Sequence, residues 1–387
     1  MREGWEIKKL GEVAAILNGY AFKSEKYENE GVRIIRITNV QKGYITDDDP
    51  KFYPAQEEII DKYKLYPNDL LISLTGNVGR VGLMPAEMLP AALNQRVACI
   101  RPITQKLLLR YLFYHLNNSI FEEACIKWSK GLAQKNMSTE WLKEYPLIIP
   151  PLSEQKRIVA ELDLLSEVIA KRREQLTQLD ALAQSLFYTM FGDPITNEKG
   201  WNVQLLGNVC KFSQGIQVDL SLQSLEPKEN WNRFLRISDY TIGNVEKRYV
   251  DVQDLKYYVY PDDVVIVRYG ASAGYVGINK EGILANNLFK LNHNKLLCDH
   301  IFLYWYLSSD YYKNFIRDVV FGAAMPALSF SSLKNFKVFI PPLALQQQFA
   351  EKIEAIEQQK ERIRQSLAEV QLLFDSRMDY YFNEWAE

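Results

Sequence analysis

The stretch PPLSEQKRIVAELD, at Pro150–Asp163, occurs a second time as PPLALQQQFAEKIE, at Pro341–Glu354. In each copy a double proline closes one segment, because proline cannot continue a strand ladder, and a run with helical spacing follows. In the first copy Ser153 suits the N-cap of a helix and Glu154 suits its first turn. A motif repeated at this distance predicts that the 387-residue chain contains two copies of one plan.

The repeat extends along most of the chain. GWEIKKLGEV from Gly4 matches GWNVQLLGNV from Gly200, and IIRITNV (34–40) matches FLRISDY (234–240). YPNDLLISLTGNVGRVG (66–82) matches YPDDVVIVRYGASAGYVG (260–277), which is one residue longer, and YLFYHL from Tyr111 matches FLYWYL from Phe302. Because the matches keep their order, each half reads as a globular αβ module followed by a long helix.

Each double proline precedes an apolar stripe whose steps alternate between three and four residues, which is the seam of a coiled coil. The first stripe has apolar Ile158, Leu162, Leu165, Ile169, Leu176, Leu179, Ala183, Leu186 and Met190, with Arg172 at one position. The second has Phe349, Ile353, Ile356, Ile363, Leu367, Val370, Phe374 and Tyr381, with Lys360 and Arg377 at two positions. Each helix needs a partner, because a helix with only such a stripe cannot stand alone in water. Each stripe could pack on its own module, but the matched register favours a mutual antiparallel pair.

These patterns predict an α+β fold with a pseudo-twofold internal repeat, in which two similar αβ globular domains are joined by two long helices that form an antiparallel coiled coil. DLLISL and DVVIVR predict short, half-buried strands after a Tyr-Pro turn, and LLLRYLFYHLNN and DHIFLYWYLSS predict buried helices. The expected boundaries are 1–150 and 196–342 for the domains and 151–195 and 343–387 for the helical regions. About 37 residues of helix span about 55 Å, so a pair of such helices is expected to hold the two globular domains a fixed distance apart.

Composition restricts the class of protein. A hydrophobic share of 47% with 24% charged residues is ordinary for a soluble globular chain, and no apolar run approaches the roughly 18 residues of a membrane span. MREGWEIKKL at the start has no apolar core typical of a signal peptide. The four cysteines form no CxxC pair, which predicts buried reduced thiols in a cytoplasmic protein without a metal site. Both domains carry a net charge of +2, so nucleic acid would have to be bound by a few well-placed residues rather than by bulk charge.

Over nearly its whole length the chain resembles the specificity (S) subunits of bacterial and archaeal Type I restriction-modification enzymes. The resemblance is carried by GWEIKKLGEV, IIRITNV, DLLISLTGNVGRVGL, GLAQKNMS and IPPLSEQKRIVAELD and by their second copies in the same order. The second copy departs from this pattern, with PPLALQQQF for PPLSEQKR and GAAMPALS for GLAQKNMS. The first departure bears on whether two partner subunits bind equally, and the second is expected if the two halves read different sequences.

The resemblance implies two target recognition domains, each reading one half of a split site in double-stranded DNA. It implies that the helical regions set the gap between the half-sites and dock two methyltransferase (M) subunits, and that restriction (R) subunits join the full complex. The chain itself would have no catalytic residue and no cofactor, because S-adenosylmethionine, ATP and Mg would act on the partner subunits. That the modified base is adenine is also implied by the resemblance alone.

Reading DNA requires cations for phosphates and amide, guanidinium or aromatic groups for base edges. Such groups gather in glycine-bearing loops of both halves. The candidates are Lys23, Arg36, Thr75, Asn77, Arg80, Gln134, Lys135 and Asn136 in the first half and Arg236, Arg268, Tyr269, Ser272 and Tyr275 in the second. Arg36 and Arg236 lie inside strand-like runs and have a structural alternative, namely pairing with a carboxylate. The loops after DLLISL and DVVIVR are the stronger candidates, since their backbone turns sharply.

Motifs of three catalytic or nucleotide-binding functions are incomplete in this sequence or have a simpler explanation. A DNA methyltransferase would need a polar residue before Pro-Pro and an aromatic residue after it, whereas IPPL has Ile and Leu there. GNVGRVG and GASAGYVG lack the Gly-Lys-Ser/Thr ending of a phosphate-binding loop, and turn glycines explain them. GDPITNEKG holds Asp193, Glu198 and Lys199, but it follows a helix stop and predicts a linker rather than a nuclease centre. A tandem protein-interaction scaffold is the alternative outside DNA recognition.

Overall fold

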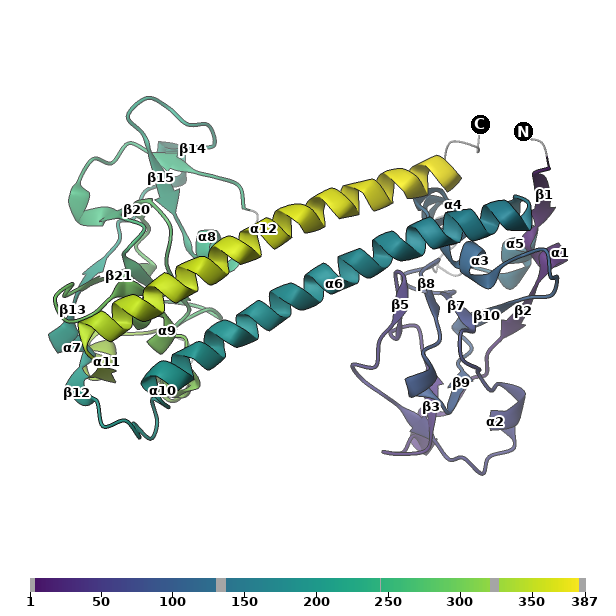
Figure 1. The fold of residues 1–387 in the computed structure, drawn as a ribbon, viewed down its shortest axis with the longest axis horizontal. Coiled ribbons are helices and arrows are strands. Elements are labelled where there is room, and N and C mark those ends of the chain that lie inside the picture. The colour runs from purple at the N-terminus through teal and green to yellow at the C-terminus, as the bar shows by residue number, and fades with distance from the viewer. Residues whose placement is uncertain (1–3, 130–136, 244, 321–326, 383–387) are drawn as a thin grey trace. The chain divides into compact units, whose positions relative to one another are not determined.

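The computed structural model describes residues 4–129, 137–243, 245–320 and 327–382. The chain divides into two compact units, and both long helices contribute to each unit (Figure 1). Unit 1 comprises Met1–Arg173 with Gln365–Glu387, and unit 2 comprises Glu174–Arg364.

Unit 1 is built on a four-stranded antiparallel sheet in the order β2 (Ala14–Asn18), β10 (Val97–Pro102), β7 (Leu70–Ser73) and β8 (Val81–Leu83). Its other strands are β1 (Glu6–Lys9) with β11 (Pro146–Ile149), β6 (Phe52–Tyr53) with β3 (Val32–Ile35) and β9 (Ala91–Leu93), and β4 (Val40–Gln41) with β5 (Tyr44–Ile45). Its short helices are α1 (Leu10–Val13), α2 (Ile59–Lys62), α3 (Leu109–His115), α4 (Ser119–Ser129) and α5 (Thr139–Glu144).

Unit 2 repeats this plan, with a four-stranded sheet in the order β13 (Cys210–Gln214), β21 (Leu288–His293), β18 (Val264–Val267) and β19 (Val276–Gly277). The remaining strands are β12 (Asn202–Leu205) with β22 (Lys337–Ile340), and the sheet β14 (Gln223–Ser224), β16 (Tyr249–Val250), β15 (Asn232–Leu235), β20 (Gly282–Leu284) and β17 (Tyr258–Val259). Its short helices are α7 (Leu206–Val209), α8 (Ile237–Thr241), α9 (His300–Tyr306), α10 (Asp310–Val320) and α11 (Phe330–Lys334). The shared strand order confirms the predicted internal repeat.

The central strands β7 and β18 follow the predicted Tyr-Pro turns, but they are fully buried rather than half-buried. The reason lies in their alternation, since successive side chains of a strand face opposite sides of the sheet. In β7, Leu70 and Ile72 join one apolar cluster of unit 1, whereas Leu71 joins a second cluster. Both faces of the central sheet are therefore covered, which gives the hairpin that leaves β7 a rigid base.

The two long helices are α6 (Leu152–Phe191) and α12 (Leu343–Phe382), each of 40 residues. Helix α6 begins at Leu152, two residues earlier than an N-cap at Ser153 predicts, so Ser153 is not its N-cap. The amide nitrogens of Glu154 and Gln155 both donate to the carbonyl oxygen of Pro151, at 2.9 and 3.0 Å. Proline can hold this position because its carbonyl oxygen accepts the first bonds of the helix while its missing N–H is not required there.

Within each unit the two long helices pack on each other in antiparallel direction (Figure 1). In unit 1 the guanidinium of Arg377 on α12 lies 2.9 Å from the carboxylate of Glu161 on α6. In unit 2 the ammonium group of Lys360 on α12 lies 2.7 Å from the carboxylate of Asp180 on α6. Residue numbers that rise along one helix meet numbers that fall along the other, which confirms the predicted antiparallel pair.

The helix ends also take part in the cores of the units. Ile158 and Leu162 of α6 join the core of unit 1 together with Tyr381 of α12, while Phe187 of α6 and Phe349 of α12 join the core of unit 2. The two alternatives left open by the apolar stripes are thus both realised. Each stripe pairs with the other helix and also anchors a helix end on a globular domain.

Candidate DNA interface

The hairpin between β7 and β8 presents the loop 74–80 on a tightly bonded base. The hydroxyl of Ser73 donates to the carbonyl oxygen of Asn77 at 2.5 Å and accepts from the amide nitrogen of Arg80 at 3.1 Å. Gly76 and Gly79 have φ of 69° and 81°, a region that favours glycine. The loop therefore has a defined backbone, and the side chain of Asn77 is exposed at its tip.

Arg80 and Thr75, two of the predicted reading residues, are less exposed than Asn77. One terminal nitrogen of the Arg80 guanidinium donates to the side-chain oxygen of Gln41 at 2.6 Å. The hydroxyl of Thr75 is buried and has no hydrogen-bond partner among the described residues. To contact a base, Arg80 would have to exchange its bond to Gln41, whereas Asn77 is available as it stands.

The hairpin between β18 and β19 has the same backbone bonds. The amide nitrogen of Gly274 donates to the carbonyl oxygen of Val267 at 2.8 Å, and that of Val267 donates to the carbonyl oxygen of Tyr275 at 2.9 Å. Ser73 of unit 1 is bonded in the same way to Gly79 and Arg80, both at 3.0 Å. Tyr275, which is 45% exposed, therefore occupies the position of Arg80.

Arg268 occupies the position that Leu74 has in unit 1. The main-chain nitrogen of each donates across the sheet edge, Leu74 to Arg96 at 3.0 Å and Arg268 to Asn287 at 2.9 Å. The Arg268 guanidinium lies 4.5 Å from the ring centre of Tyr269 and 5.2 Å from that of Phe289. One backbone plan thus carries a buried leucine in one half and an aromatic-stacked cation in the other.

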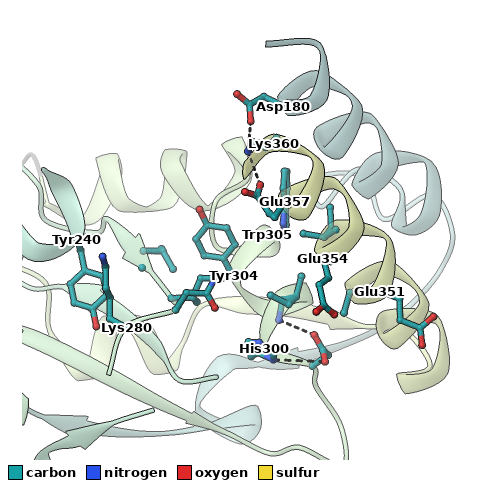
Figure 2. A pocket seen from close by; sticks show the side chains of 18 of the residues that line it. Asp180, Tyr240, Lys280, His300, Tyr304, Trp305, Glu351, Glu354, Glu357 and Lys360 are labelled. Carbon is teal, nitrogen blue, oxygen red and sulfur yellow. Dashed lines mark hydrogen bonds and ion pairs between the residues drawn. The ribbon is translucent and has the colours of Figure 1, made fainter. Parts of the chain in front are cut away.

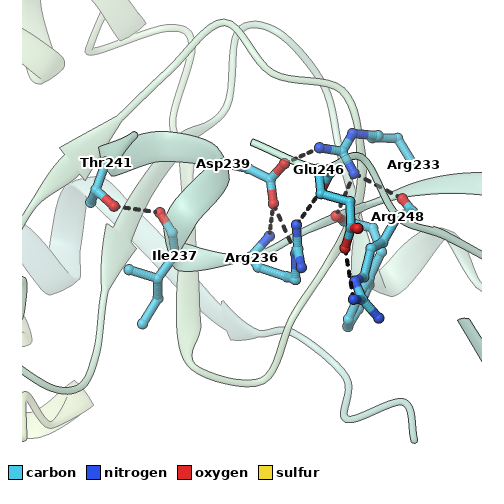
Figure 3. A network of polar contacts seen from close by, with 8 residues as sticks. Arg233, Arg236, Ile237, Asp239, Thr241, Glu246 and Arg248 are labelled. Carbon is cyan, nitrogen blue, oxygen red and sulfur yellow. Dashed lines mark hydrogen bonds and ion pairs between the residues drawn. The ribbon is translucent and has the colours of Figure 1, made fainter. Parts of the chain in front are cut away.

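Arg36 and Arg236 each follow a strand by one residue, rather than lying inside it, and both contact carboxylates. A terminal nitrogen of the Arg36 guanidinium lies 3.0 Å from the Asp49 carboxylate. The Nε of Arg236 lies 3.2 Å from the buried Asp239 carboxylate, which Arg233 also binds (Figure 3). The contact favours the structural alternative for Arg236, because a buried carboxylate is stable only when it is paired. The Asp49 carboxylate is 66% exposed, so the Arg36 pair is a surface contact and leaves both alternatives open for Arg36.

The remaining predicted DNA contacts are distributed as follows. The Lys23 side chain is 67% exposed, with its ammonium group 3.9 Å from Glu25. Ser272 is partly buried, and Tyr269 is 40% exposed. Gln134, Lys135 and Asn136 lie outside the described residues. Lys23, Asn77, Tyr269 and Tyr275 are therefore the exposed candidates in the described part of the chain.

The predicted seam residues face the interior to different degrees. Buried are Ile158, Leu162, Ile169, Phe349, Ile353, Ile356 and Ile363, and partly buried are Leu165, Leu176, Leu179, Leu186, Leu367, Val370 and Phe374. The seam position of Lys360 is also buried, at 8% exposure. The helices are therefore most deeply buried where they meet the globular domains.

Sequence reasoning missed two glutamines. The side chain of Gln155 accepts from the amide nitrogen of Leu108 at 2.9 Å and donates to the carbonyl oxygens of Lys106 and Pro150 at 2.7 and 2.8 Å. Gln346 makes the equivalent three bonds in unit 2, with Asp299, Leu297 and Pro341. Each glutamine is completely buried and ties a long helix to the loop before α3 or α9. The same residue type stands at this place in both copies of the double-proline motif, and that repetition is the sequence signal that could have identified the two glutamines.

The described residues contain no group of three or more His, Cys, Asp or Glu side chains that could hold a metal ion. All four cysteines are buried and free, as predicted. In the GDPITNEKG segment, Asp193 accepts from the amide nitrogen of Ile195 and Glu198 accepts from the Thr196 hydroxyl, so both carboxylates serve the local turn. No described helix is both long enough and apolar enough to cross a membrane.

Comparison with known families matches both halves of the chain. Residues 2–179 and 198–372 each match the Type I restriction modification DNA specificity domain. The chain belongs to this family. The two matched ranges coincide with the two copies of the internal repeat, so the duplication in this S-family chain is a duplication of the specificity domain itself.

Individual relatives match this chain along most of their own length. The chain is 24% identical to the Type I restriction enzyme EcoBI specificity subunit of Escherichia coli, covering 92% of this chain and 80% of that protein. It is 23% identical to the putative type I restriction enzyme MjaX specificity subunit of Methanocaldococcus jannaschii, covering 92% and 87%. The crystal structure of the Type I restriction-modification S subunit from M. genitalium superposes with a TM-score of 0.63 at 16% identity, over 97% of this chain and 95% of that one. At this identity the superposition supports the fold.

Proposed function

We propose that this chain is the non-catalytic DNA-specificity subunit of a Type I restriction-modification complex. Each globular domain reads one half of a bipartite site in double-stranded DNA. The carrying observation is the pair of hairpins, which share their backbone bonds but present Leu74 and Arg80 in one half against Arg268 and Tyr275 in the other. Different side chains on one backbone plan are what two different half-sites require, because base identity is read by side-chain chemistry.

The proposed roles of individual residues follow their exposure. Asn77, Arg80, Arg268 and Tyr275 are assigned to base edges, with Thr75, Tyr269 and Ser272 beside them in the same loops. Lys23 is assigned to a phosphate, because its side chain is exposed and lies only within a long 3.9 Å contact of Glu25. Arg36 and Arg236 support the neighbouring loops through Asp49 and Asp239. Gln134, Lys135 and Asn136 keep their proposed role in DNA contact on the strength of their sequence alone.

The long helices have the second proposed role. In the proposed organisation, residues 1–150 and 196–342 are the target recognition domains, and residues 151–195 and 343–387 are helical regions that set the gap and dock two M subunits. Restriction subunits join the full complex. S-adenosylmethionine, ATP and Mg act on the partner subunits, and the assembly works in the cytoplasm.

The decisive experiment maps methylated adenines in the genome of a host that expresses this chain with its M partner. We expect one split motif with a constant gap, and loss of that motif when this chain is omitted. Methylation of an unsplit motif, or methylation that persists without this chain, would overturn the proposal. Calorimetry with S-adenosylmethionine and the purified chain should show no binding, and stoichiometric binding would contradict the assignment of that cofactor to the partners.

A further inference from the structure

Unit 2 contains an open cavity of about 1000 Å³ lined by α9, α12 and the β18–β19 hairpin (Figure 2). Its lining includes five carboxylates, Asp180, Asp299, Glu351, Glu354 and Glu357, against the two lysines Lys280 and Lys360. The ammonium group of Lys360 is already bonded to Asp180 at 2.7 Å and to Glu357 at 2.6 Å. The cavity is therefore acidic, a property that repels the phosphates of DNA.

The matching positions of unit 1 show how that half neutralises its carboxylate. The Asp163 carboxylate on α6 accepts from the Nε of Arg110 and from the hydroxyl of Tyr114, both on α3 and both at 2.6 Å. By the register of the repeat, these three positions correspond to Glu354 on α12 and to Ile301 and Trp305 on α9. Unit 2 has thus kept the carboxylate and replaced both of its partners with apolar side chains.

Among the described residues Glu354 consequently has no cation partner, and its one polar contact is with the side-chain amide of Gln358, at 3.5 Å. Glu351, one helical turn earlier, makes no ion pair within the described residues, and its counterpart in unit 1 is Ala160. Figure 2 shows Glu351, Glu354 and Glu357 in succession along α12, next to Trp305. Divergence has therefore added Glu351 and Glu357 here, in place of Ala160 and Ser166, while the cation that it added, Lys360 in place of Ile169, is already bonded to Asp180 and Glu357.

The wall of the cavity offers further groups for a ligand. The phenolic oxygen of Tyr240 is buried and has no hydrogen-bond partner among the described residues, although buried polar atoms are nearly always bonded. Tyr304 and Trp305 expose part of their rings to the cavity. An aromatic face beside carboxylates suits a guanidinium group, which can stack on the ring while it binds the acid.

We propose that this cavity binds a cationic segment of a partner subunit, whose arginine or lysine supplies to Glu354 and Glu351 the charge that Arg110 supplies to Asp163 in unit 1. This inference rests on the proposed function, in which the helical regions dock two M subunits. It adds that two identical partners meet unlike surfaces on the two halves. The partner at unit 2 is held more strongly by charge and is released first as salt increases, because ion pairs at partly exposed sites are screened.

The test uses the full chain assembled with its M partner. The groove variant carries Glu351→Gln and Glu354→Gln, and the matched control carries Glu361→Gln and Glu369→Gln, which remove the same charge from exposed positions of α12 outside the cavity. Stoichiometry is followed by native mass spectrometry through a salt titration. We expect the groove variant to bind one of its two partners about tenfold more weakly, while the control matches the unmodified chain. Equal salt profiles for the groove variant and the control would overturn the inference.

A second arm separates this inference from the proposed function. Binding of a fluorescent oligoarginine peptide to the full chain alone is measured by anisotropy. We expect the groove variant to bind the peptide about tenfold more weakly than the control does. If the unmodified chain binds no M subunit, the proposed function fails, and this arm still decides the cavity. Equal peptide affinity in both variants would show that the cavity is not a cation site.

Discussion

Lys360 of α12 and Asp180 of α6 form an ion pair of 2.7 Å at a seam position that is otherwise apolar. The Lys360 side chain is 10% exposed and also contacts Glu357 at 2.6 Å. Burial lowers the pKa of Lys360, but the hydrogen bonds from Asp180 and Glu357 raise it further, so the net pKa lies above the ordinary 10.5. The lysine is therefore charged at neutral pH, and a single charged residue in a seam selects one register of two helices.

Lys360→Met should leave the free energy of unfolding nearly unchanged or raise it, because a buried ion pair replaced by an apolar side chain of similar size costs little. Removing both carboxylates with Asp180→Ala and Glu357→Ala should instead destabilise the chain by about 1 kcal/mol, because the ammonium group loses its partners but the two carboxylates are themselves 64% and 46% exposed. Urea denaturation at neutral pH compares the two variants. A larger loss in Lys360→Met than in the double variant would show that the pair itself is the source of stability.

Gln155→Leu should destabilise unit 1 by about 3 kcal/mol, since three hydrogen bonds are lost at a completely buried site. Gln346→Leu should have the same effect in unit 2, because it makes the same set of bonds. Chemical denaturation measures both, and Gln178→Leu on the exposed face of α6 provides the control. An effect below that of the control would mean that the two glutamines do not fasten the helices to the domains.

Acid should weaken unit 1 through His115. Burial beside Tyr111 and Phe382 lowers the pKa of His115 from 6.5 to about 4. Below pH 6.5 His115 is protonated in the unfolded chain but stays neutral in the folded chain. The contribution of His115 to the free energy of unfolding is therefore fully present above pH 6.5 and is lost as the pH falls toward 4. This difference corresponds to about 3 kcal/mol at the acid end of the window. Between pH 6.5 and 4 the free energy of unfolding should fall more steeply in the unmodified chain than in His115→Leu, which lacks this group. Equal slopes in the two chains would contradict the prediction.

Lengthening both long helices should change the gap in the DNA site. Seven residues inserted after Arg173 and seven after Arg364 keep the seam in register and add about 10 Å to each helix, or about three base pairs. Mapping methylated adenines should then show unchanged half-sites separated by a longer gap. An insertion of four residues in each helix breaks the seven-residue register and should abolish activity. An unchanged gap after the seven-residue insertion would contradict the prediction, because it would show that the helices pack the domains without setting the gap.

Base discrimination should divide between the halves. Asn77→Ala and Arg80→Ala should relax one half of the site, and Arg268→Ala and Tyr275→Ala the other, by about 1–3 kcal/mol per lost bidentate contact. Lys23→Ala is the control, because loss of a phosphate contact should weaken all sequences equally and reduce the salt dependence.

The measurement is binding of the assembled complex to a DNA library with each half randomised in turn. If Arg80→Ala altered both halves or neither, the assignment of the 74–80 loop to base reading would be wrong. Tyr275 also lines the acidic cavity. If Tyr275→Ala lost a partner subunit but kept the base preference of the complex, the role of Tyr275 would be to dock the partner rather than to read DNA.

Sequence alone was sufficient for the features that repeat locally. The apolar steps from Ile158 to Met190 and from Phe349 to Tyr381 predicted two paired helices, because helical periodicity is written into neighbouring residues. The duplicated Tyr-Pro turns placed β7 and β18 for the same reason. Burial of these strands on both faces could not be predicted, since Leu70 and Leu71 face two different clusters assembled from distant segments.

Only the tertiary structure decided which polar side chains meet. Gln155 looked like any polar residue of an amphipathic helix until the fold brought the chain at Lys106 and Leu108 against it. Arg236 could read DNA or bind a carboxylate, and the buried Asp239 beside it favours the second role. Polar partners of this kind lie far apart in sequence and have no period, so their pairing depends on how the strands and helices are packed. The same holds for Glu354, whose missing cation became visible only by comparison with the bonded Asp163 of the other half.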